Sequence, residues 1–277
     1  MEITEGSNVT RPILNFKSLD TFLKWTGIGW FCVAAIGQIA FIAFILLYYG
    51  TRTATGHFEA WNDKPIIKGH VPGDDFGNLM FALHVMLATA MTLTGLIQLV
   101  PFLRRRYPAL HRWSGRTFLV LACFLALGGL WLIWGRSTYL SLISAVPTSI
   151  NAILILACSV YTIRFAMQRR IADHQRWAMR TFMVANGVWF MRVFMMAWIM
   201  INQSPRWMNR TLSGPADIAI SFGSFLVPLM VLELYMMARR STSATAKALA
   251  SGLVIVATLI TAIGIAGAMM FMWFQSY

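Results

Sequence analysis

Seven long apolar stretches constrain this chain of 277 residues more than any other feature. Each is close to the roughly 20 residues that a helix needs to cross the hydrocarbon core of a bilayer. Backbone groups cannot stay unpaired in lipid, and the stretches do not alternate polar and apolar residues as barrel strands do, so they predict helices. The expected spans are residues 25–49, 77–101, 117–135, 147–167, 181–201, 216–237 and 249–274.

The composition agrees with a multi-pass membrane protein. Hydrophobic residues make up 58% of the chain and charged residues 12%, whereas soluble domains carry about 25% charged residues. A disordered chain is excluded because its apolar content would be far lower. The three cysteines lie singly inside apolar stretches, so no disulfide framework is expected.

The placement of the basic residues predicts the orientation. The net charge of +13 comes from 23 Lys and Arg against 10 Asp and Glu, and most of the basic residues lie in alternate loops. The positive-inside rule places these loops in the cytoplasm, with the N-terminus inside and the C-terminus outside. We expect an N-terminal cytoplasmic tail at 1–24 and a seven-helix membrane domain at 25–277 with an outer loop at 50–76. The expected partner of the basic loops is a bilayer with anionic headgroups, and nucleic acid is not expected.

Two of these basic turns match each other without gaps. One reads RRYPALHRWSGRTFLV (residues 105–120) and the other RRIADHQRWAMRTFMV (residues 169–184). Each joins a helix entering the cytoplasm to one leaving it, so the second and third spans are predicted to be a parallel duplicate of the fourth and fifth. In the first turn Arg112, Trp113 and Arg116 share a helix face. They either contact lipid headgroups or bind an anionic ligand, such as haem propionates, or an acidic partner.

Ionisable side chains inside the predicted spans are candidates for function, because such residues are rare in membranes. His84 lies in the outer half of the second span, and Arg192 lies near the middle of the fifth. Glu233, in the sixth span, is placed to neutralise Arg180 or Arg192. These groups either fix the register of the helices or form a ligand site, and the residues leave both interpretations open.

Histidines on both sides of the membrane suggest a b-type haem, which axial His and propionate-binding Arg usually hold. His84, together with His57 or His70, would form an outer pair, and His111 with His174 an inner pair. No metal site is expected, and the chain has no phosphate loop, nucleophile elbow or zinc-protease motif. The predicted cofactor-binding residues are His84, His111, His174, Arg112, Arg116, Arg180 and Arg192, and the further site residues are Glu233, Trp113 and Trp177.

Residues 81–118 and 173–184 resemble a bacterial domain-of-unknown-function family of predicted multi-pass membrane proteins. The shared features are the helical His84, the HRWxGR turn at residues 111–116, and the HxxWxxR pattern at residues 174–180. The resemblance covers the second to fifth spans. It implies a multi-pass protein of the bacterial inner (plasma) membrane and no particular reaction. At the level of the fold, the family is distantly similar to membrane b-type cytochromes and transmembrane ferric reductases.

Three functions stay open at this point. The first is a membrane redox protein, an oxidoreductase or electron-transfer component, that binds haem b or a quinone. The second is a proton-coupled small-molecule transporter with its path along His84, Arg192 and Glu233. The third is a non-catalytic subunit that assists assembly of a larger membrane complex. Small residues along the last span allow close helix packing, within the chain or in a homo-oligomer. They are Ala257, Thr261, Gly264 and Ala268.

Overall fold

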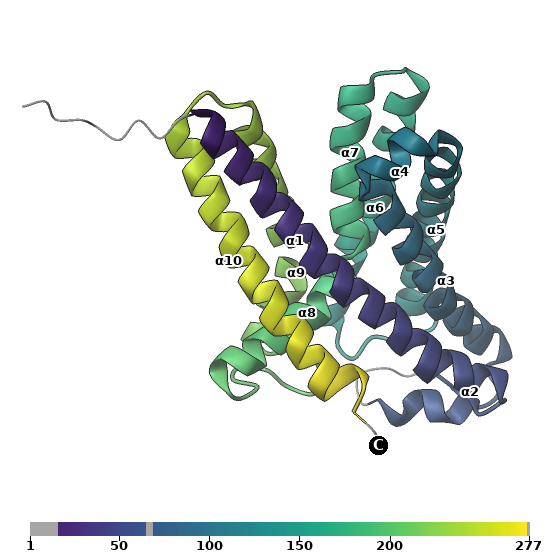
Figure 1. Cartoon of the computed structure of the whole chain (residues 1–277). Coiled ribbons are helices and arrows are strands. Elements are labelled where there is room, and N and C mark those ends of the chain that lie inside the picture. The colour runs from purple at the N-terminus through teal and green to yellow at the C-terminus, as the bar shows by residue number, and fades with distance from the viewer. Residues whose placement is uncertain (1–15, 65–68, 276–277) are drawn as a thin grey trace, which may run out of the picture.

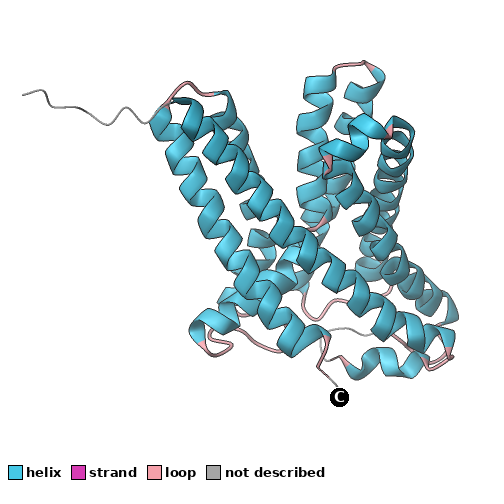
Figure 2. Cartoon of the chain, viewed as in Figure 1, coloured by secondary structure: helices cyan, strands magenta, loops and turns pink. Residues whose placement is uncertain are grey.

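The computed structural model describes residues 16–64 and 69–275, and every regular element in this part is a helix (Figure 2). The long helices are α1 (Phe16–Ile45), α3 (Asp75–Leu99), α5 (Pro108–Trp134), α6 (Leu142–Met167), α7 (Ile171–Ala185), α8 (Gly187–Asn202), α9 (Pro215–Arg240) and α10 (Ala244–Ala268). The short elements are α2 (Thr51–Ala54), α4 (Pro101–Arg106), the π-helical segments Leu46–Gly50 and Met269–Trp273, and the 3-10 helix Phe58–Asp63.

The prediction of an all-helical membrane bundle is confirmed. In the described ranges six single helices are long and apolar enough to cross a membrane, and the number is seven if α7 and α8, which are bent by 55° at their junction, count as one span. The bend was not predicted, because the apolar stretch at 181–201 continues through it without interruption. The two halves of this span therefore point in different directions.

The first helix starts earlier than the apolar stretch predicted. Within the described part α1 begins at Phe16, so the predicted tail at 1–24 is helical from there on, and residues 1–15 lie outside the described residues. The extension is held by Asp20, whose carboxylate accepts hydrogen bonds from Lys247 Nζ at 2.6 Å and from an Arg239 guanidinium nitrogen at 3.0 Å. Leu23 is fully buried on the same extension. Packing and ion pairing thus continue the helix beyond its apolar part.

The helices form two groups, which spread apart towards one end of the molecule and meet at the other (Figure 1). One group contains α3 to α7 and the other contains α1, α9 and α10. Because α8 packs against α9 and α10, the bend after α7 carries the chain from the first group to the second. α1 packs against α10 and also contacts α3, so it joins the two groups.

Small residues of the last span pack inside the chain. A Cβ atom at Gly264 would collide with the backbone carbonyl of Val193 in α8, so α8 and α10 approach each other closely. Thr261 and Ala268 are also buried. The close packing predicted for this stripe therefore occurs within one copy of the chain, and a homo-oligomer stays a prediction.

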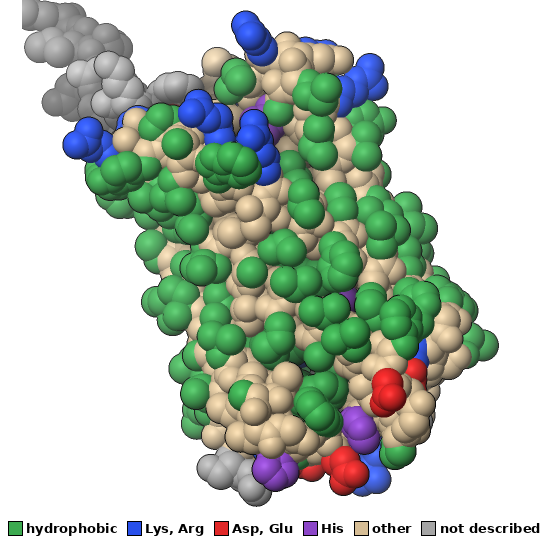
Figure 3. Space-filling view, turned by 90° about the vertical axis from the view of Figure 1, so that its right-hand side faces the viewer, with side chains coloured by type: hydrophobic (Ala, Val, Ile, Leu, Met, Phe, Trp, Pro, Cys, Tyr) green, Lys and Arg blue, Asp and Glu red, His purple; other side chains and the backbone are tan. Residues whose placement is uncertain are grey.

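Lys and Arg side chains gather at one end of the molecule, at the top of Figure 3. This Arg-rich end contains α4, the turn between α6 and α7, and the turn between α9 and α10 (Figure 1). The acidic and His side chains visible in the same view lie mainly at the opposite end. The assignment of the Arg-rich end to the cytoplasm stays a prediction.

Candidate functional site

A cavity of about 320 Å³ lies between α1, α3, α5, α6 and α8. Its wall is mainly apolar and includes the aromatic rings of Phe41, Phe44, Phe81 and Trp189. Small-molecule sites typically have volumes of about 300–1,000 Å³ and an apolar lining with a few polar groups. The cavity lies at the level of the membrane-spanning helices and has the size and wall of a ligand site.

The polar side chains that line this cavity come from several elements and include His84 of α3, Asn151 of α6, Arg192 of α8, and Tyr49 of the π-helical segment after α1. His84 Nδ1, the Tyr49 hydroxyl and Asn151 Oδ1 are buried and have no hydrogen-bond partner among the described residues. Buried polar atoms in native proteins are nearly always paired, so unpaired ones require an explanation. Three of these atoms belong to residues that line one cavity, which therefore has hydrogen-bonding groups to offer a ligand or water.

Arg192 adds a positive charge without a carboxylate partner in the described part of the chain. Its guanidinium donates to the Val188 carbonyl of its own helix at 3.1 Å, and its Cζ lies 5.6 Å from the centre of the Phe41 ring. It is close enough to His84 and Tyr49 for electrostatic interaction. A guanidinium does not deprotonate in proteins, and an unneutralised charge in a membrane is costly. The cavity therefore favours an occupant with electron-rich oxygen atoms.

The break between α7 and α8 directs Arg192 into the cavity. Asn186 lies at the break, where its Nδ2 donates to the Phe182 carbonyl at 2.8 Å and its Oδ1 accepts from Gln38 Nε2 at 3.2 Å. Asn151 Nδ2 donates to the Val184 carbonyl at 3.1 Å. Side-chain amides thus pair backbone groups near the break, which is the condition for irregular backbone at membrane depth.

A signal for this break is present in the sequence at Asn186 and Gly187. An Asn side chain competes for backbone hydrogen bonds, and Gly allows a close approach of another chain segment. A Cβ atom at Gly187 would lie only 2.5 Å from Asn151 Nδ2. The pair lies in an otherwise continuous apolar run, so hydropathy alone did not reveal it.

The predicted cofactor-binding residues divide between two places. His84 and Arg192 line the cavity, whereas His57 and His70 do not. The inner histidines are also outside its lining: His174 Nδ1 bonds the Thr162 carbonyl at 3.0 Å, and His111 is near enough to His174 for electrostatic interaction. The cavity lining thus contains one member of the predicted outer pair, His84, while the two members of the predicted inner pair lie near each other elsewhere, and the role of both pairs stays a prediction. The other residues outside the cavity lining are Arg112, Arg116, Arg180, Trp113, Trp177 and Glu233.

The partner of Glu233 is Arg180, the first of the two arginines considered from the sequence. Arg180 Nε and Nη2 donate to the two carboxylate oxygens at 2.5 and 2.9 Å, which joins α7 to α9. Arg180 also lies over the Trp177 ring at 4.7 Å, and Arg116 lies over the Trp113 ring at 5.1 Å. The two basic turns therefore share an Arg–Trp contact, as a duplication predicts, and the duplication itself stays a prediction.

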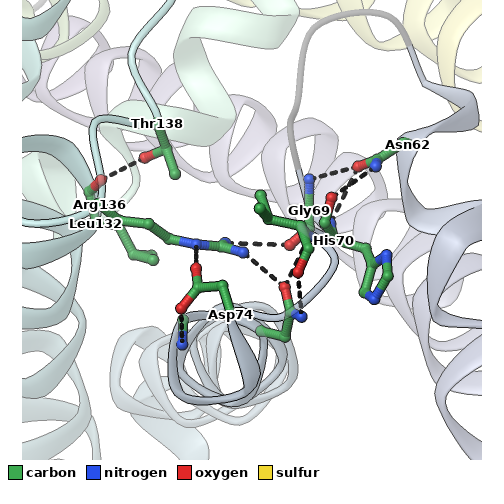
Figure 4. Close-up of polar contacts among 10 residues, drawn as sticks. Asn62, Gly69, His70, Asp74, Leu132, Arg136 and Thr138 are labelled. Carbon is green, nitrogen blue, oxygen red and sulfur yellow. Dashed lines mark hydrogen bonds and ion pairs between the residues drawn. The ribbon is translucent and has the colours of Figure 1, made fainter.

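At the end opposite the Arg-rich end, an arginine fixes the loop beside the cavity (Figure 4). The Arg136 side chain, only 5% exposed, donates to Asp74 Oδ2 at 2.6 Å, to Asn78 Oδ1 at 2.6 Å and to the Gly69 carbonyl at 3.1 Å. The hydrogen bonds that Asp74 accepts from Arg136 and from the Gly77 backbone N–H hold the pKa of its carboxyl below its usual value. Thr138, two residues after Arg136, lines the cavity. The sequence did not reveal this contact, because its partners are far apart in the chain.

In the described ranges no three His, Cys, Asp or Glu side chains lie close enough together to hold a metal ion. The cavity itself combines polar side chains from several elements with a mainly apolar wall, as small-molecule sites do.

The model of a family described as "Predicted membrane protein (DUF2306)" matches residues 81–236. This range is more than half of the chain and runs from α3 into α9. It includes His84, Arg192 and both basic turns. No curated protein and no solved structure matches the chain. The chain therefore belongs to the DUF2306 family of predicted membrane proteins.

Proposed function

We propose that this membrane protein is a redox protein that binds a quinone in the cavity between α1, α3, α5, α6 and α8. The observation that carries the proposal is the convergence of His84 and Arg192, from different helices, on one apolar cavity, where neither has a hydrogen-bond or ion-pair partner from another helix among the described residues. A quinone dissolves in the bilayer core, so this ligand is also consistent with the expected location in a bacterial inner membrane.

The lining suits the chemistry of a quinone. The flat ring can pack against Phe41, Phe44 and Trp189, whose faces favour stacked or edge contacts with another ring. Its two carbonyl oxygens are acceptors, for which Arg192 and His84 supply donors. Reduction increases the negative charge on these oxygens, and a fixed guanidinium stabilises that charge most strongly in a dry site.

A quinone fits this lining better than haem b does. Haem iron in a membrane usually takes axial His ligands, and His84 is the only imidazole among the described residues that line the cavity. His111 and His174 lie near the Arg-rich end instead. A quinone needs hydrogen-bond donors and an apolar slot rather than a pair of axial ligands, so the side chains present suffice for it.

The test is to purify the full chain in a mild detergent, extract it with organic solvent and search for a quinone by chromatography. Binding of a short-chain quinone to the emptied protein is then measured by calorimetry. His84→Leu and Arg192→Gln should each weaken binding about tenfold, because a lost hydrogen bond of about 1.4 kcal/mol corresponds to that factor. Thr148→Val is the matched control. Thr148 lines the same cavity, but its hydroxyl already bonds the Ser144 carbonyl at 3.2 Å.

Two results would overturn the proposal. One is the absence of both co-purifying quinone and measurable binding. The other is equal affinity in the wild type, the two site variants and the Thr148→Val control. Circular dichroism on each variant verifies that the helices are intact. If the reduced-minus-oxidised absorption spectrum instead contains haem bands that His84→Leu removes, haem b replaces quinone as the ligand.

A further inference from the structure

The two basic turns at the Arg-rich end differ in how their charges are balanced. In the second turn Asp173 accepts a hydrogen bond from Arg170 Nε at 2.8 Å and also bonds Arg176. Arg180, slightly further along, is neutralised by Glu233. The second turn therefore has one counter-ion of its own, Asp173, and a second one, Glu233, supplied by α9.

The first turn has no such counter-ion. Residues 101–116 contain five arginines and no acidic residue, and Ala109 stands at the position that aligns with Asp173. None of these arginines forms an ion pair with an acidic residue in the described part of the chain. They are Arg104, Arg105, Arg106, Arg112 and Arg116. The first turn thus carries a positive charge without acidic partners, whereas three of the four arginines in the second turn are ion-paired.

A shallow groove lies where α4 meets α5, between two of these arginines. Leu103, Pro108 and Leu110 contribute an apolar surface, and Arg106 and Arg112 line the same groove. The neighbouring Phe102 and Trp113 side chains are 61% and 66% exposed, respectively. Aromatic side chains of this kind favour the boundary between headgroups and hydrocarbon. The groove therefore combines an apolar floor with two guanidinium groups that have no acidic partner among the described residues, and it lies at the edge of the membrane-spanning part.

We infer that this groove binds an anionic phospholipid, with the phosphate between Arg106 and Arg112 and part of an acyl chain along Leu103 and Leu110. Guanidinium groups bind phosphate through paired, charge-assisted hydrogen bonds. The apolar floor favours a lipid over a free anion, because it offers a soluble anion no partner. This site is separate from the cavity, and the inference does not depend on the quinone proposal.

The experiment measures lipid binding to the full chain in detergent by native mass spectrometry, with phosphatidylglycerol and phosphatidylcholine in competition. The wild type should bind phosphatidylglycerol preferentially. The double variant Arg106→Gln/Arg112→Gln should lose about thirtyfold in affinity for it, since each basic group near a membrane contributes about fivefold. Ala109→Asp should also weaken the binding, because it introduces the acid that the second turn already has. Arg106 and Arg112 are exposed, so the substitutions leave the core unchanged.

Arg176→Gln provides the matched control, since Arg176 aligns with Arg112 but already bonds Asp173. It should leave the preference for phosphatidylglycerol unchanged. Equal binding of the two lipids by the wild type would overturn the inference. If Arg176→Gln loses as much affinity for phosphatidylglycerol as the double variant does, the inference is also overturned. Nonspecific attraction of the anionic lipid to basic residues would then explain the binding. Inorganic phosphate that displaces phosphatidylglycerol at equal concentration would show a site for the free anion rather than for a lipid.

Discussion

Replacing Asn151 by Leu tests the role of the break between α7 and α8. Asn151 is 6% exposed, and its Nδ2 donates to the carbonyl of Val184, a residue with no exposed surface. In the variant this carbonyl loses the hydrogen bond from α6 and gains no access to water. The variant should therefore unfold more easily, although Leu keeps a similar side-chain shape and adds apolar surface.

Two magnitudes bracket the expected loss. A buried polar group left without its partner costs about 1–3 kcal/mol. Hydrogen bonds between membrane helices contribute about 0.6 kcal/mol on average and at most about 1.7, because the unfolded chain in the membrane also finds partners. Val184 is fully buried beside a helix break, so the upper part of the membrane range applies. We expect the free energy of unfolding to fall by about 1.5 kcal/mol.

The measurement is reversible unfolding in mixed micelles with increasing sodium dodecyl sulfate, followed by circular dichroism. Thr148→Val is again the control, because it lies one turn away on α6 and its hydroxyl bonds only its own helix. The control should change the free energy of unfolding by less than about 0.5 kcal/mol, as is usual for substitutions that break no special feature. If Asn151→Leu is as stable as Thr148→Val, the hydrogen bond does not stabilise the break and the reasoning is refuted.

Two further predictions concern the packing of α10 and the loop beside the cavity. Gly264→Val should lower the thermal midpoint in a size-exclusion stability assay, because its side chain would collide with the Val193 carbonyl and overpacking costs about 1–3 kcal/mol. Gly252→Val should not lower the midpoint in this way, because a Cβ atom at Gly252 meets nothing within 4 Å. Equal shifts of the midpoint in the two variants would contradict the packing argument. Arg136 lowers the pKa of Asp74 in the folded protein, so the ionised carboxylate stabilises the fold. This stabilisation is complete above the pKa of the unfolded carboxyl, about 3.9, and is lost as the pH falls through the lower pKa of the folded state. Asp74→Asn should therefore reduce the loss of thermal stability on acidification, and an unchanged acid profile would contradict this assignment.

The membrane-spanning architecture was predictable because it depends on local composition. About 20 apolar residues in a row satisfy their backbone only as a helix in lipid, so each stretch predicts its own span. Glu233 and Arg180 were also predictable as partners, since a membrane disfavours unneutralised charges. The helix ends were predicted less accurately. Contacts of Asp20 and Leu23 extend α1 beyond its apolar stretch, and hydropathy does not measure such contacts.

The sequence by itself therefore determined that the chain crosses a membrane, which stretches do so, and that His84 and Arg192 are unusual inside it. Only the tertiary structure decided that these two side chains share a cavity, and that the inner histidines lie elsewhere. It also decided that Arg192 lies on a helix that turns by 55° after α7. The physical reason is that burial in lipid acts on each segment separately. The direction in which a buried side chain points depends instead on packing and hydrogen bonds between residues far apart in the chain, such as Gln38 and Asn186.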